Sequence, residues 1–375
     1  MNRLLFEDVV DENSDFLSEQ LITYIGNKRS LLPFIGRGLD KASNRLGNKK
    51  LRIFDAFSGS GIVSRFMKGY AKTLIVNDLE KYAEVISKCY LTNKEDINLS
   101  NLTECYNNLV NKLELEPLRK GIITELYAPE DDNNIKQGER VFYTNRNAKY
   151  VDTARMYIEN IPEEFKVFLL APLLSEASIH ANTSGVFKGF YKDSENNIGM
   201  FGGNNADALL RIKGNISIPF PVFSNYSCEV QVHRGDSNTI TKCIDDVDLT
   251  YVDPPYNQHP YGSNYFMLNL IVDYIRPTNI SDVSGIPSDW NRSDYNRRKL
   301  AIDTFEDLVE TLPSKFLLIS FNSEGFISLD QMKELLNKKG KTEVLETKYN
   351  TFRGSRNLRE RAIHVNEYLF LVEKK

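Results

Sequence analysis

The chain has 375 residues, of which 41% are hydrophobic and 26% are charged, so a sizeable globular core is expected. A net charge of −4 argues against a protein that coats nucleic acid non-specifically, but one basic face would suffice for a nucleic-acid enzyme. The four cysteines show neither CxxC spacing nor clustered histidines, so we expect no zinc site, no other metal and no disulfide scaffold. Apolar runs are too short to cross a bilayer and the N-terminus lacks a signal core, which predicts a cytoplasmic protein.

The first informative segment is YIGNKRSLLPFI, residues 24–35, which precedes any predicted strand. Gly26 and Asn27 suit a turn, Lys28 supplies a cation, and the following apolar residues open a helix. In isolation this is an N-cap turn at Ser30 with a solvated lysine. Beside a nucleoside cofactor, however, the ammonium group of Lys28 would pair with a carboxylate of that cofactor.

An alternating pattern of strands and helices then begins. Residues 51–57 (LRIFDAF) predict a short buried strand, and a helix is predicted over 61–70 after the glycine turn SGSG. Residues 73–80 (TLIVNDLE) predict a second strand that ends in an acid, followed by another helix over 81–94. This order indicates the start of an open α/β sheet.

The glycine turn is a candidate cofactor site. Gly59 and Gly61 let the backbone approach a ligand closely, although a lone G-x-G also occurs in ordinary strand-to-helix turns. Asp78 follows at the end of the next strand, where a carboxylate can accept hydrogen bonds from ribose hydroxyls. Because no third glycine follows Gly61, the turn is not a dinucleotide fingerprint, and a nucleoside cofactor without a pyrophosphate fits better.

Residues 94–227 change in character and are predicted to form an inserted, mainly helical domain, while residues 1–93 and 228–375 form the catalytic domain. The helical periodicity is clearest over residues 153–161 and 165–181. Within the insertion, Asn182, Thr183, Ser184 and Lys188 are candidate contacts to bases or phosphates, and Arg140 and Arg146 are weaker ones.

The strand pattern resumes after the insertion. Strands are predicted at residues 229–236, 249–255, 316–325 and 367–374, with helices at 265–275 and 328–339. Asp236, in HRGD, ends its strand and could bond the amine of a cofactor adenine; an ordinary turn aspartate is the alternative.

The tetrapeptide DPPY follows the strand at 249–255. Two prolines end a strand, but a turn requires neither the preceding acid nor the following aromatic residue. Asp253 and the carbonyl of Pro254 can accept the two N–H groups of an exocyclic amine. The prolines, Pro254 and Pro255, would stiffen that corner, and Tyr256 offers a face on which an extruded base can stack. The tetrapeptide is therefore interpreted as a base-binding catalytic site.

Two basic stretches are candidate phosphate contacts, with solvated surface as the alternative. The first, residues 288–301, interleaves aromatic residues with arginines, and the second, residues 351–361, is a loop-like run before the last strand. The candidate contacts in them are Arg292, Arg297, Arg298, Arg353 and Arg356.

With YIGNK, DAFSGSG, the Asn77–Asp78 pair, HRGD and DPPY in that order, the chain resembles the N6-adenine DNA methyltransferases of the Dam-like α group. Its DPPYNQHPYGSNYF stretch is similar to type II restriction-modification methylases such as the one that accompanies the FokI nuclease. The resemblance implies a Rossmann-like fold with a mostly parallel seven-stranded sheet and an inserted target-recognition domain. It also implies a prokaryotic enzyme acting on double-stranded DNA, with a cognate nuclease as a separate partner and without a membrane partner.

The implied cofactor is S-adenosyl-L-methionine, with S-adenosyl-L-homocysteine as product. By the resemblance, Lys28 contacts the methionine carboxylate, Asp78 the ribose and Asp236 the adenine, and Asp253–Tyr256 hold the target base. The full set of implied cofactor-binding residues is Tyr24, Gly26, Asn27, Lys28, Asp55, Phe57, Gly59, Gly61, Asp78, Asp236 and Asp253.

Alternatives remain at this point. N4-cytosine methyltransferases carry a related tetrapeptide, although more often with serine first, and RNA base methyltransferases also carry DPPY. A non-catalytic DNA-binding protein would have no need of every cofactor motif. Carbon-5 cytosine methylation needs a cysteine after proline, which is absent here. We expect a monomer, because an asymmetric recognition domain suits a non-palindromic site.

Overall fold

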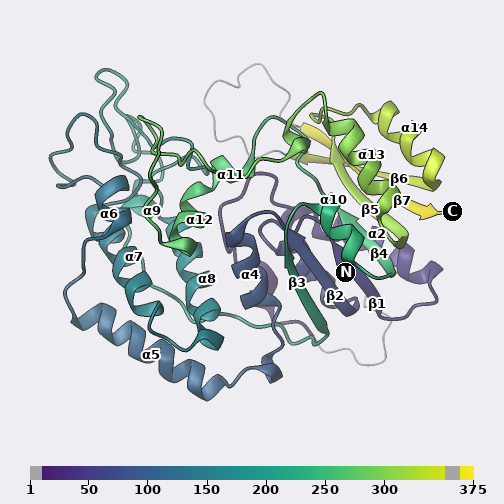
Figure 1. Cartoon of the computed structure of the whole chain (residues 1–375), viewed down its shortest axis with the longest axis horizontal. Coiled ribbons are helices and arrows are strands. Elements are labelled where there is room, and N and C mark those ends of the chain that lie inside the picture. The colour runs from purple at the N-terminus through teal and green to yellow at the C-terminus, as the bar shows by residue number, and fades with distance from the viewer. Residues whose placement is uncertain (1–10, 351–363) are drawn as a thin grey trace.

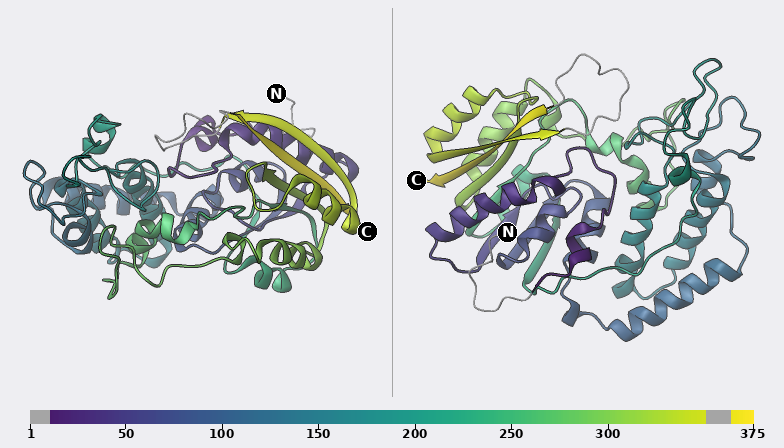
Figure 2. Two further views of the ribbon diagram at one scale, coloured as in Figure 1. Left: turned by 90° about the horizontal axis from the view of Figure 1, so that it is seen from above. Right: turned by 180° about the vertical axis from the view of Figure 1, so that it is seen from behind.

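The structure is a computed structural model that describes residues 11–350 and 364–375, and it has two lobes lying side by side (Figure 1). One lobe is built on a β-sheet and the other on helices. The two further views in Figure 2 show the same division, with helices on both faces of the sheet.

The sheet has seven strands in the order β3-β2-β1-β4-β5-β7-β6. The first five strands of that order pair in parallel, while β7 is antiparallel to both β5 and β6. The strands are β1 (Leu51–Asp55), β2 (Ala71–Asp78), β3 (Glu229–Arg234), β4 (Val247–Val252), β5 (Ser314–Asn322), β6 (Gly340–Asn350) and β7 (His364–Lys374). The predicted α/β class and mostly parallel seven-stranded sheet are therefore confirmed.

Six of the seven strands coincide with predicted runs, and β6 was missed. The central strand β4 is buried at all six positions, as expected for a parallel strand covered on both faces. In contrast, β6 lies at the sheet edge and is rich in charged and polar residues such as Lys341, Thr342 and Glu343. An edge strand of this composition gives only a weak hydrophobic signal.

Helices cover both faces of the sheet and build the second lobe. They are α1 (Ser14–Ser18), α2 (Leu32–Arg45), α3 (Ile62–Met67), α4 (Lys81–Leu91), α5 (Leu99–Leu115), α6 (Ile122–Tyr127), α7 (Asn145–Ile158), α8 (Glu163–Ile179), α9 (Leu209–Lys213), α10 (Ser237–Ile240), α11 (Tyr261–Asn264), α12 (Phe266–Asp273), α13 (Ala301–Thr311) and α14 (Leu329–Lys339). None of the helices in the described ranges is long and apolar enough to cross a bilayer.

Each lobe has its own core. On one face of the sheet, Leu39 of α2 and Met67 of α3 belong to one buried cluster, and on the other face Phe305 of α13 belongs to a second. A third cluster joins the helices of the insertion to Ile86 of α4 and Phe266 of α12. The helix that follows the tetrapeptide therefore packs into the core of the helical lobe, whereas the boundaries at 94 and 227 stay a prediction.

A buried carboxylate fastens the helical lobe internally. Asp152, in α7, accepts hydrogen bonds from the backbone N–H groups of Gly121, Ile123 and Thr124 at 2.8–3.0 Å. It also accepts one from the hydroxyl of Tyr274 at 2.8 Å, just beyond α12. One side chain thus fixes the start of α6 against α7 and against the segment that returns to the sheet.

Candidate active site

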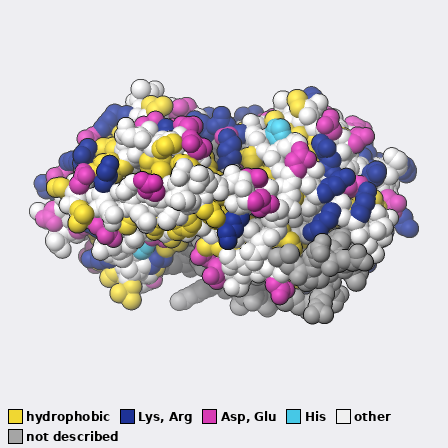
Figure 3. Space-filling view, turned by 90° about the horizontal axis from the view of Figure 1, so that it is seen from below, with side chains coloured by type: hydrophobic (Ala, Val, Ile, Leu, Met, Phe, Trp, Pro, Cys, Tyr) yellow, Lys and Arg dark blue, Asp and Glu magenta, His cyan; other side chains and the backbone are white. Residues whose placement is uncertain are grey.

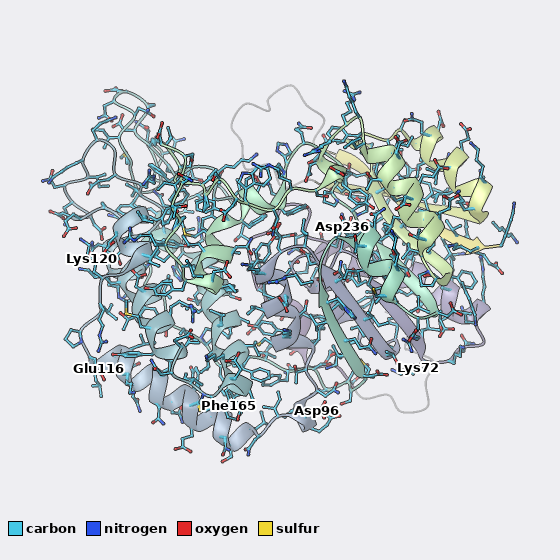
Figure 4. All side chains as sticks on the ribbon, viewed as in Figure 1. Lys72, Asp96, Glu116, Lys120, Phe165 and Asp236 are labelled. Atoms are coloured by element: carbon cyan, nitrogen blue, oxygen red, sulfur yellow. The ribbon has the colours of Figure 1, made fainter. Side chains whose placement is uncertain are left out.

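The motif residues converge at the carboxyl ends of β1 to β4. The chain order reverses between β1 and β4, because β2 and β3 lie on one side of β1 and β5 lies beyond β4. Ligands of open α/β sheets bind at such a switch point. A cavity of about 860 Å³, including the solvent at its mouth, opens there. Figure 4 shows Asp236 at that end of β3.

Most of the predicted cofactor residues line this cavity. They are Tyr24, Gly26, Asn27, Lys28, Phe57, Gly59, Asp78, Asp236 and Asp253. The two exceptions are Asp55 and Gly61, which lie behind the lining residues. Residues distant in the sequence, from the turn before β1 to the segment after β4, are thus assembled into one wall.

The glycine turn is shaped by close contacts on both sides. Gly59 has φ +52° and its N–H donates to Asp78 Oδ2 at 2.8 Å, while Asp78 Oδ1 accepts from the N–H of Glu80 at 2.9 Å. A Cβ at Gly59 would lie 3.0 Å from Cε1 of Tyr24. The positive φ and the crowding both favour glycine. Burial raises the pKa of Asp78, and these backbone hydrogen bonds lower it in part.

Asp55 supports the turn from below. It is completely buried at the end of β1, where it accepts hydrogen bonds from the hydroxyl of Ser64 and from the N–H of Phe57. Burial raises its pKa to about 7, against the lowering effect of these bonds. Gly61 has φ +76° and begins α3. Both residues therefore hold the turn in place rather than face the cavity.

Asn77 joins the strand ends around the cavity. Its amide donates to the carbonyls of Ala56 and Gly235 at 3.3 and 3.1 Å. Ser237 donates to the same Ala56 carbonyl at 2.7 Å. Asn77 thus ties the residues after β1 to those after β3, which explains its place beside Asp78.

The tetrapeptide sits between two cavities. Asp253 and Pro255 line the main cavity, whereas Pro254, Pro255 and Tyr256 line a smaller apolar one of about 230 Å³. Tyr256 packs edge-on against Phe321 of β5, with 5.9 Å between the ring centroids. The rigid corner therefore presents Asp253 to the main cavity.

Lys28 is held in the same corner by an ion pair. Its Nζ lies 3.2 Å from Asp253 Oδ1, and only 4% of its side chain is exposed. The ammonium group also lies 5.6 Å from the centroid of the Tyr256 ring. Burial alone would lower the pKa of Lys28, but the charge of Asp253 and neighbouring groups holds that pKa well above its usual value. The lysine turn and the tetrapeptide are consequently one electrostatic unit.

Three residues near the cavity were not singled out from the sequence. Glu80 lines the cavity, and burial raises its pKa to about 7 although it accepts hydrogen bonds from Asn269 and Asn291. Tyr261 also lines it and stacks on Tyr24, with 5.0 Å between the ring centroids. The third, Glu367, is a buried carboxylate on β7 whose pKa is raised by burial and lowered by Lys28. The acid in NDLE and the aromatic repeat after DPPY were available signals for the first two.

The predicted DNA contacts of the insertion differ from one another. Asn182 is completely buried; its amide donates to the carbonyl of Val141 at 2.8 Å and its oxygen accepts from Gly202 N–H at 2.9 Å. This position is inaccessible to DNA in the structure, because the side chain holds its own loop together. Lys188 is exposed, and burial together with the charge of Lys188 lowers the pKa of His259 in the loop after the tetrapeptide.

The weaker candidates in the insertion bond internally. Arg140 donates to the carbonyl of Asp282 at 3.1 Å, and Arg146 donates to that of Ile216 at 3.0 Å. Both guanidinium groups therefore tie segments of the helical lobe together.

The first basic stretch borders the cavity. Asn291 lines the cavity and its amide donates to Glu80 Oε2 at 3.1 Å. Next to it, Arg292 is exposed and lies 4.3 Å from the centroid of the Trp290 ring. Arg297 and Arg298 are also exposed, and Arg297 pairs with Asp294 at 3.2 Å. Arg353 and Arg356 lie outside the described residues.

The face turned to the viewer in Figure 3 carries basic and acidic side chains intermixed. That face therefore presents no uniform positive field for a polyanion. Next to the cavity wall, Arg292 follows the lining residue Asn291 and Arg297 follows the lining residue Asn296, and both cations are exposed.

The sheet order, the glycine turn and the aspartate–diproline–tyrosine corner together define a Rossmann-like methyltransferase. The family model of D12 class N6 adenine-specific DNA methyltransferases matches residues 24–283. The chain therefore belongs to this family, and the adenine-directed reading is confirmed over the N4-cytosine, RNA and non-catalytic alternatives.

Curated relatives agree with the family. The chain is 30% identical to Type II methyltransferase M.NlaIII of Neisseria lactamica over 361 residues, covering 94% of this chain and 99% of the relative. It is 30% identical over 359 residues to Type II methyltransferase M.CviAII of Paramecium bursaria Chlorella virus 1, covering 94% and 98%. Type II methyltransferase M.FokI of Planomicrobium okeanokoites is 24% identical over 366 residues, and the chain spans about half, 52%, of its length. The sequence-based resemblance to type II methylases is confirmed.

One solved structure, of Thermoplasma acidophilum 1320, aligns with 92% of this chain and 97% of its own at a TM-score of 0.32 and 9% identity. That similarity is too low to support a conclusion.

Proposed function

We propose that this DNA adenine methyltransferase binds S-adenosyl-L-methionine in the main cavity and methylates an adenine that is turned out of duplex DNA and held at Asp253–Tyr256. The observation that carries this proposal is the position of Asp253, which lines the cavity and also begins the tetrapeptide. One carboxylate can therefore contact a base at the point where the cofactor cavity ends.

The lining residues fit this cofactor chemically. Asp78 and Asp236 supply carboxylates for hydroxyl and amine donors, Phe57 and Ile62 supply apolar surface, and Lys28 supplies a cation for a carboxylate. Lys28 has three N–H donors, so pairing with Asp253 leaves donors for a second partner. Bound there, S-adenosyl-L-methionine would supply a methyl group on a positively charged sulfur.

The tetrapeptide would act on the target amine by positioning and polarisation. Asp253 accepts one N–H of the exocyclic amine and the carbonyl of Pro254 accepts the other, which favours a tetrahedral nitrogen with an available lone pair. The Tyr256 ring stacks on the base, a contact worth about 1–3 kcal/mol. Burial raises the pKa of Asp253, and the ion pair with Lys28 lowers that pKa in part and fixes the orientation of the carboxylate. These roles require no covalent enzyme intermediate.

DNA would lie across the mouth of the cavity, between the two lobes. In this proposal the insertion, residues 94–227, reads the base sequence, while Lys188, Arg292, Arg297 and Arg298 contact phosphates. Their exposure beside the tetrapeptide loop and the cavity wall supports the assignment. Phosphate contacts hold the duplex in register while the target base leaves the stack, which costs a few kcal/mol.

The proposal extends to the biological setting. Because the relatives are named type II methyltransferases and modification methylases, we propose that a separate nuclease with the same recognition site accompanies this enzyme. We propose that it acts as a monomer, as an asymmetric recognition lobe suggests. Light scattering after size-exclusion chromatography, with and without site-containing DNA, tests the monomer directly.

The decisive experiment supplies the purified protein with methyl-labelled S-adenosyl-L-methionine and mixed genomic DNA, and identifies the labelled nucleoside after digestion. Label in N6-methyl-2′-deoxyadenosine, lost in Asp253→Ala and retained in Asp245→Ala, is expected. Asp245 is a suitable control because its side chain is 90% exposed and pairs with Arg52 away from the cavity. Label that persists in Asp253→Ala would overturn the assignment of the tetrapeptide.

A further inference from the structure

Ile25 stands at the tip of the turn that carries Lys28. The N–H of Asn27 donates to the carbonyl of Tyr24 at 3.3 Å, and Gly26 has φ +73°, so Ile25 and Gly26 are the two central residues of a β-turn. The positive φ at the second central position explains Gly26. Nothing in turn geometry calls for an isoleucine before it, where proline or a polar residue is common.

Two tyrosines, the buried Tyr265 and the half-buried Tyr261, hold the backbone of Ile25 on both sides. The hydroxyl of Tyr265 accepts from the N–H of Ile25 at 2.7 Å, and the hydroxyl of Tyr261 donates to its carbonyl at 3.2 Å. Both rings stack on Tyr24, with centroid separations of 4.8 and 5.0 Å. The tip of the turn is therefore supported by α11 and the residue that precedes α12, directly after the tetrapeptide loop.

The side chain itself is left in solvent. It is 41% exposed, although Tyr24 and Gly26 on either side line the cavity. Among the exposed large hydrophobic residues of the described chain, only Ile25 is flanked by cavity-lining residues in this way. Because isoleucine is β-branched, its χ1 is stiff and the apolar tip has a fixed direction.

The surroundings place Ile25 where the two lobes meet. A Cβ added at Gly26 would lie 3.5 Å from the hydroxyl of Tyr256 in the tetrapeptide. On the other side, a Cβ added at Gly185 of the insertion would lie 3.4 Å from Cγ2 of Thr23. In Figure 1 the chain between α1 and α2 accordingly runs past α11 between the lobes. The turn thus lies between the base-binding corner and the loop that contains Lys188.

We propose that the side chain of Ile25 is the apolar wedge that occupies the duplex when the target adenine leaves it. Proteins that distort DNA insert apolar side chains such as isoleucine between base steps, and an extruded base leaves a gap beside its former neighbours. The inference rests on the proposed function. A rigid, exposed, apolar side chain next to the tetrapeptide Asp253–Tyr256 can fill that gap and stack against the neighbouring bases.

The wedge would also link flipping to catalysis. Ile25 is three residues from Lys28, which pairs with Asp253. A duplex that presses on the tip of the turn therefore acts on the segment that orients the catalytic carboxylate. This gives Ile25 a positioning role, without contact to the reacting atoms.

The test begins by mapping N6-methyladenine in DNA from cells that express the protein, which provides the recognition sequence. A duplex with 2-aminopurine at the target position then reports flipping as a rise in fluorescence. Ile25→Ala is expected to lower the flipped fraction and the methylation rate by about tenfold, the scale of lost apolar contacts in a binding site. Ile25→Leu should retain most of both. Ile275→Ala, at an isoleucine that is 72% exposed elsewhere, should match the wild type.

A duplex with an abasic target position separates a wedge from a contact to the flipped adenine. A wedge fills the gap whether or not a base is present, so Ile25→Ala should bind the abasic duplex about tenfold more weakly than wild type. Equal binding of the abasic duplex, or equal flipping by Ile25→Ala and wild type, would overturn the proposal. If the wild type makes no N6-methyladenine, the proposed function fails first, and this outcome is recognised before any variant is compared.

Discussion

The carboxyl edge of the sheet and the inserted lobe use their polar side chains in different ways. At the carboxyl ends of the strands, Asp78 and Asp253 form bonds within the protein and still face the cavity. In the insertion, Asn182 and Arg146 direct their polar atoms to backbone groups of the lobe itself. A motif aspartate that faces the cavity is therefore the candidate for chemistry, whereas the buried Asp55 and a polar residue of an insertion loop act as scaffold. Substitutions in both regions test that contrast.

The largest effect is expected at the tetrapeptide. Asp253→Ala should lower kcat by about 100- to 1000-fold, because it removes a group that stabilises the developing charge on the target amine. Affinity for S-adenosyl-L-methionine, measured by calorimetry, should change little by comparison. A wild-type kcat in this variant would show that Asp253 has only a structural role. The sheet lobe and the insertion would then no longer differ in how they use this polar side chain.

Lys28→Met should be both less stable and less active. Removing one partner of a buried ion pair leaves the charge of Asp253 uncompensated, at a cost of roughly 3 kcal/mol in the free energy of unfolding. Burial raises the pKa of Asp253 and Lys28 lowers it in part, so loss of Lys28 should raise that pKa further and move the acidic limb of kcat/KM to higher pH. Lys28→Arg, which retains the charge, should restore the pH profile in part. Denaturant unfolding and pH–rate profiles measure the two effects, and an unmoved limb in Lys28→Met would contradict the coupling.

Asn182→Ala and Lys188→Ala form a matched pair within one loop. Truncating Asn182 leaves buried backbone groups unpaired and should reduce stability by about 1–3 kcal/mol. Truncating Lys188 should leave stability unchanged but weaken DNA binding and reduce its salt dependence by about one phosphate contact. Thermal unfolding and DNA titrations at several salt concentrations separate them. If Asn182→Ala lost DNA affinity without loss of stability, its original assignment as a DNA contact would be restored.

The smallest effect concerns Glu80. Burial raises its pKa from 4.5 to about 7, so the folded protein retains a proton that the unfolded chain releases. Stability from this group is present at acidic pH and is lost as pH rises through about 7. Glu80→Gln keeps an acceptor without the charge and should therefore flatten the fall in Tm between pH 4.5 and about pH 7, the range set by the two pKa values. Glu195→Gln, on the exposed surface of the insertion, should leave the fall in Tm with pH unchanged.

Much of the sheet and of the site followed from local sequence. Buried parallel strands such as β4 are continuous apolar runs, and the motif residues lie at strand ends, where parallel topology brings them together. Glu367 did not follow, since its relevance depends on its interaction with Lys28, more than 200 residues away in the chain. The prediction that Asn182 contacts DNA disagrees with its burial for a related reason. Whether an asparagine faces DNA or its own loop is decided by burial, which a single sequence does not reveal in a glycine-rich stretch.

The packing of α12 limits how such an enzyme can be given a new specificity. Phe266 and Leu268, which follow the tetrapeptide, share one buried cluster with α8 of the insertion and with Ile86 of α4. A chimaera that exchanged residues 94–227 alone would pack the inserted helices of one enzyme against α4 and α12 of another. The side chains of that shared cluster would then come from two sequences that did not evolve together. Grafts that carry residues 265–271 together with the insertion keep more of that core together, and α4 has to be matched to both because it belongs to the same cluster. The inserted lobe and the helix that follows the tetrapeptide are therefore expected to be inherited, and to be transplanted, as one piece.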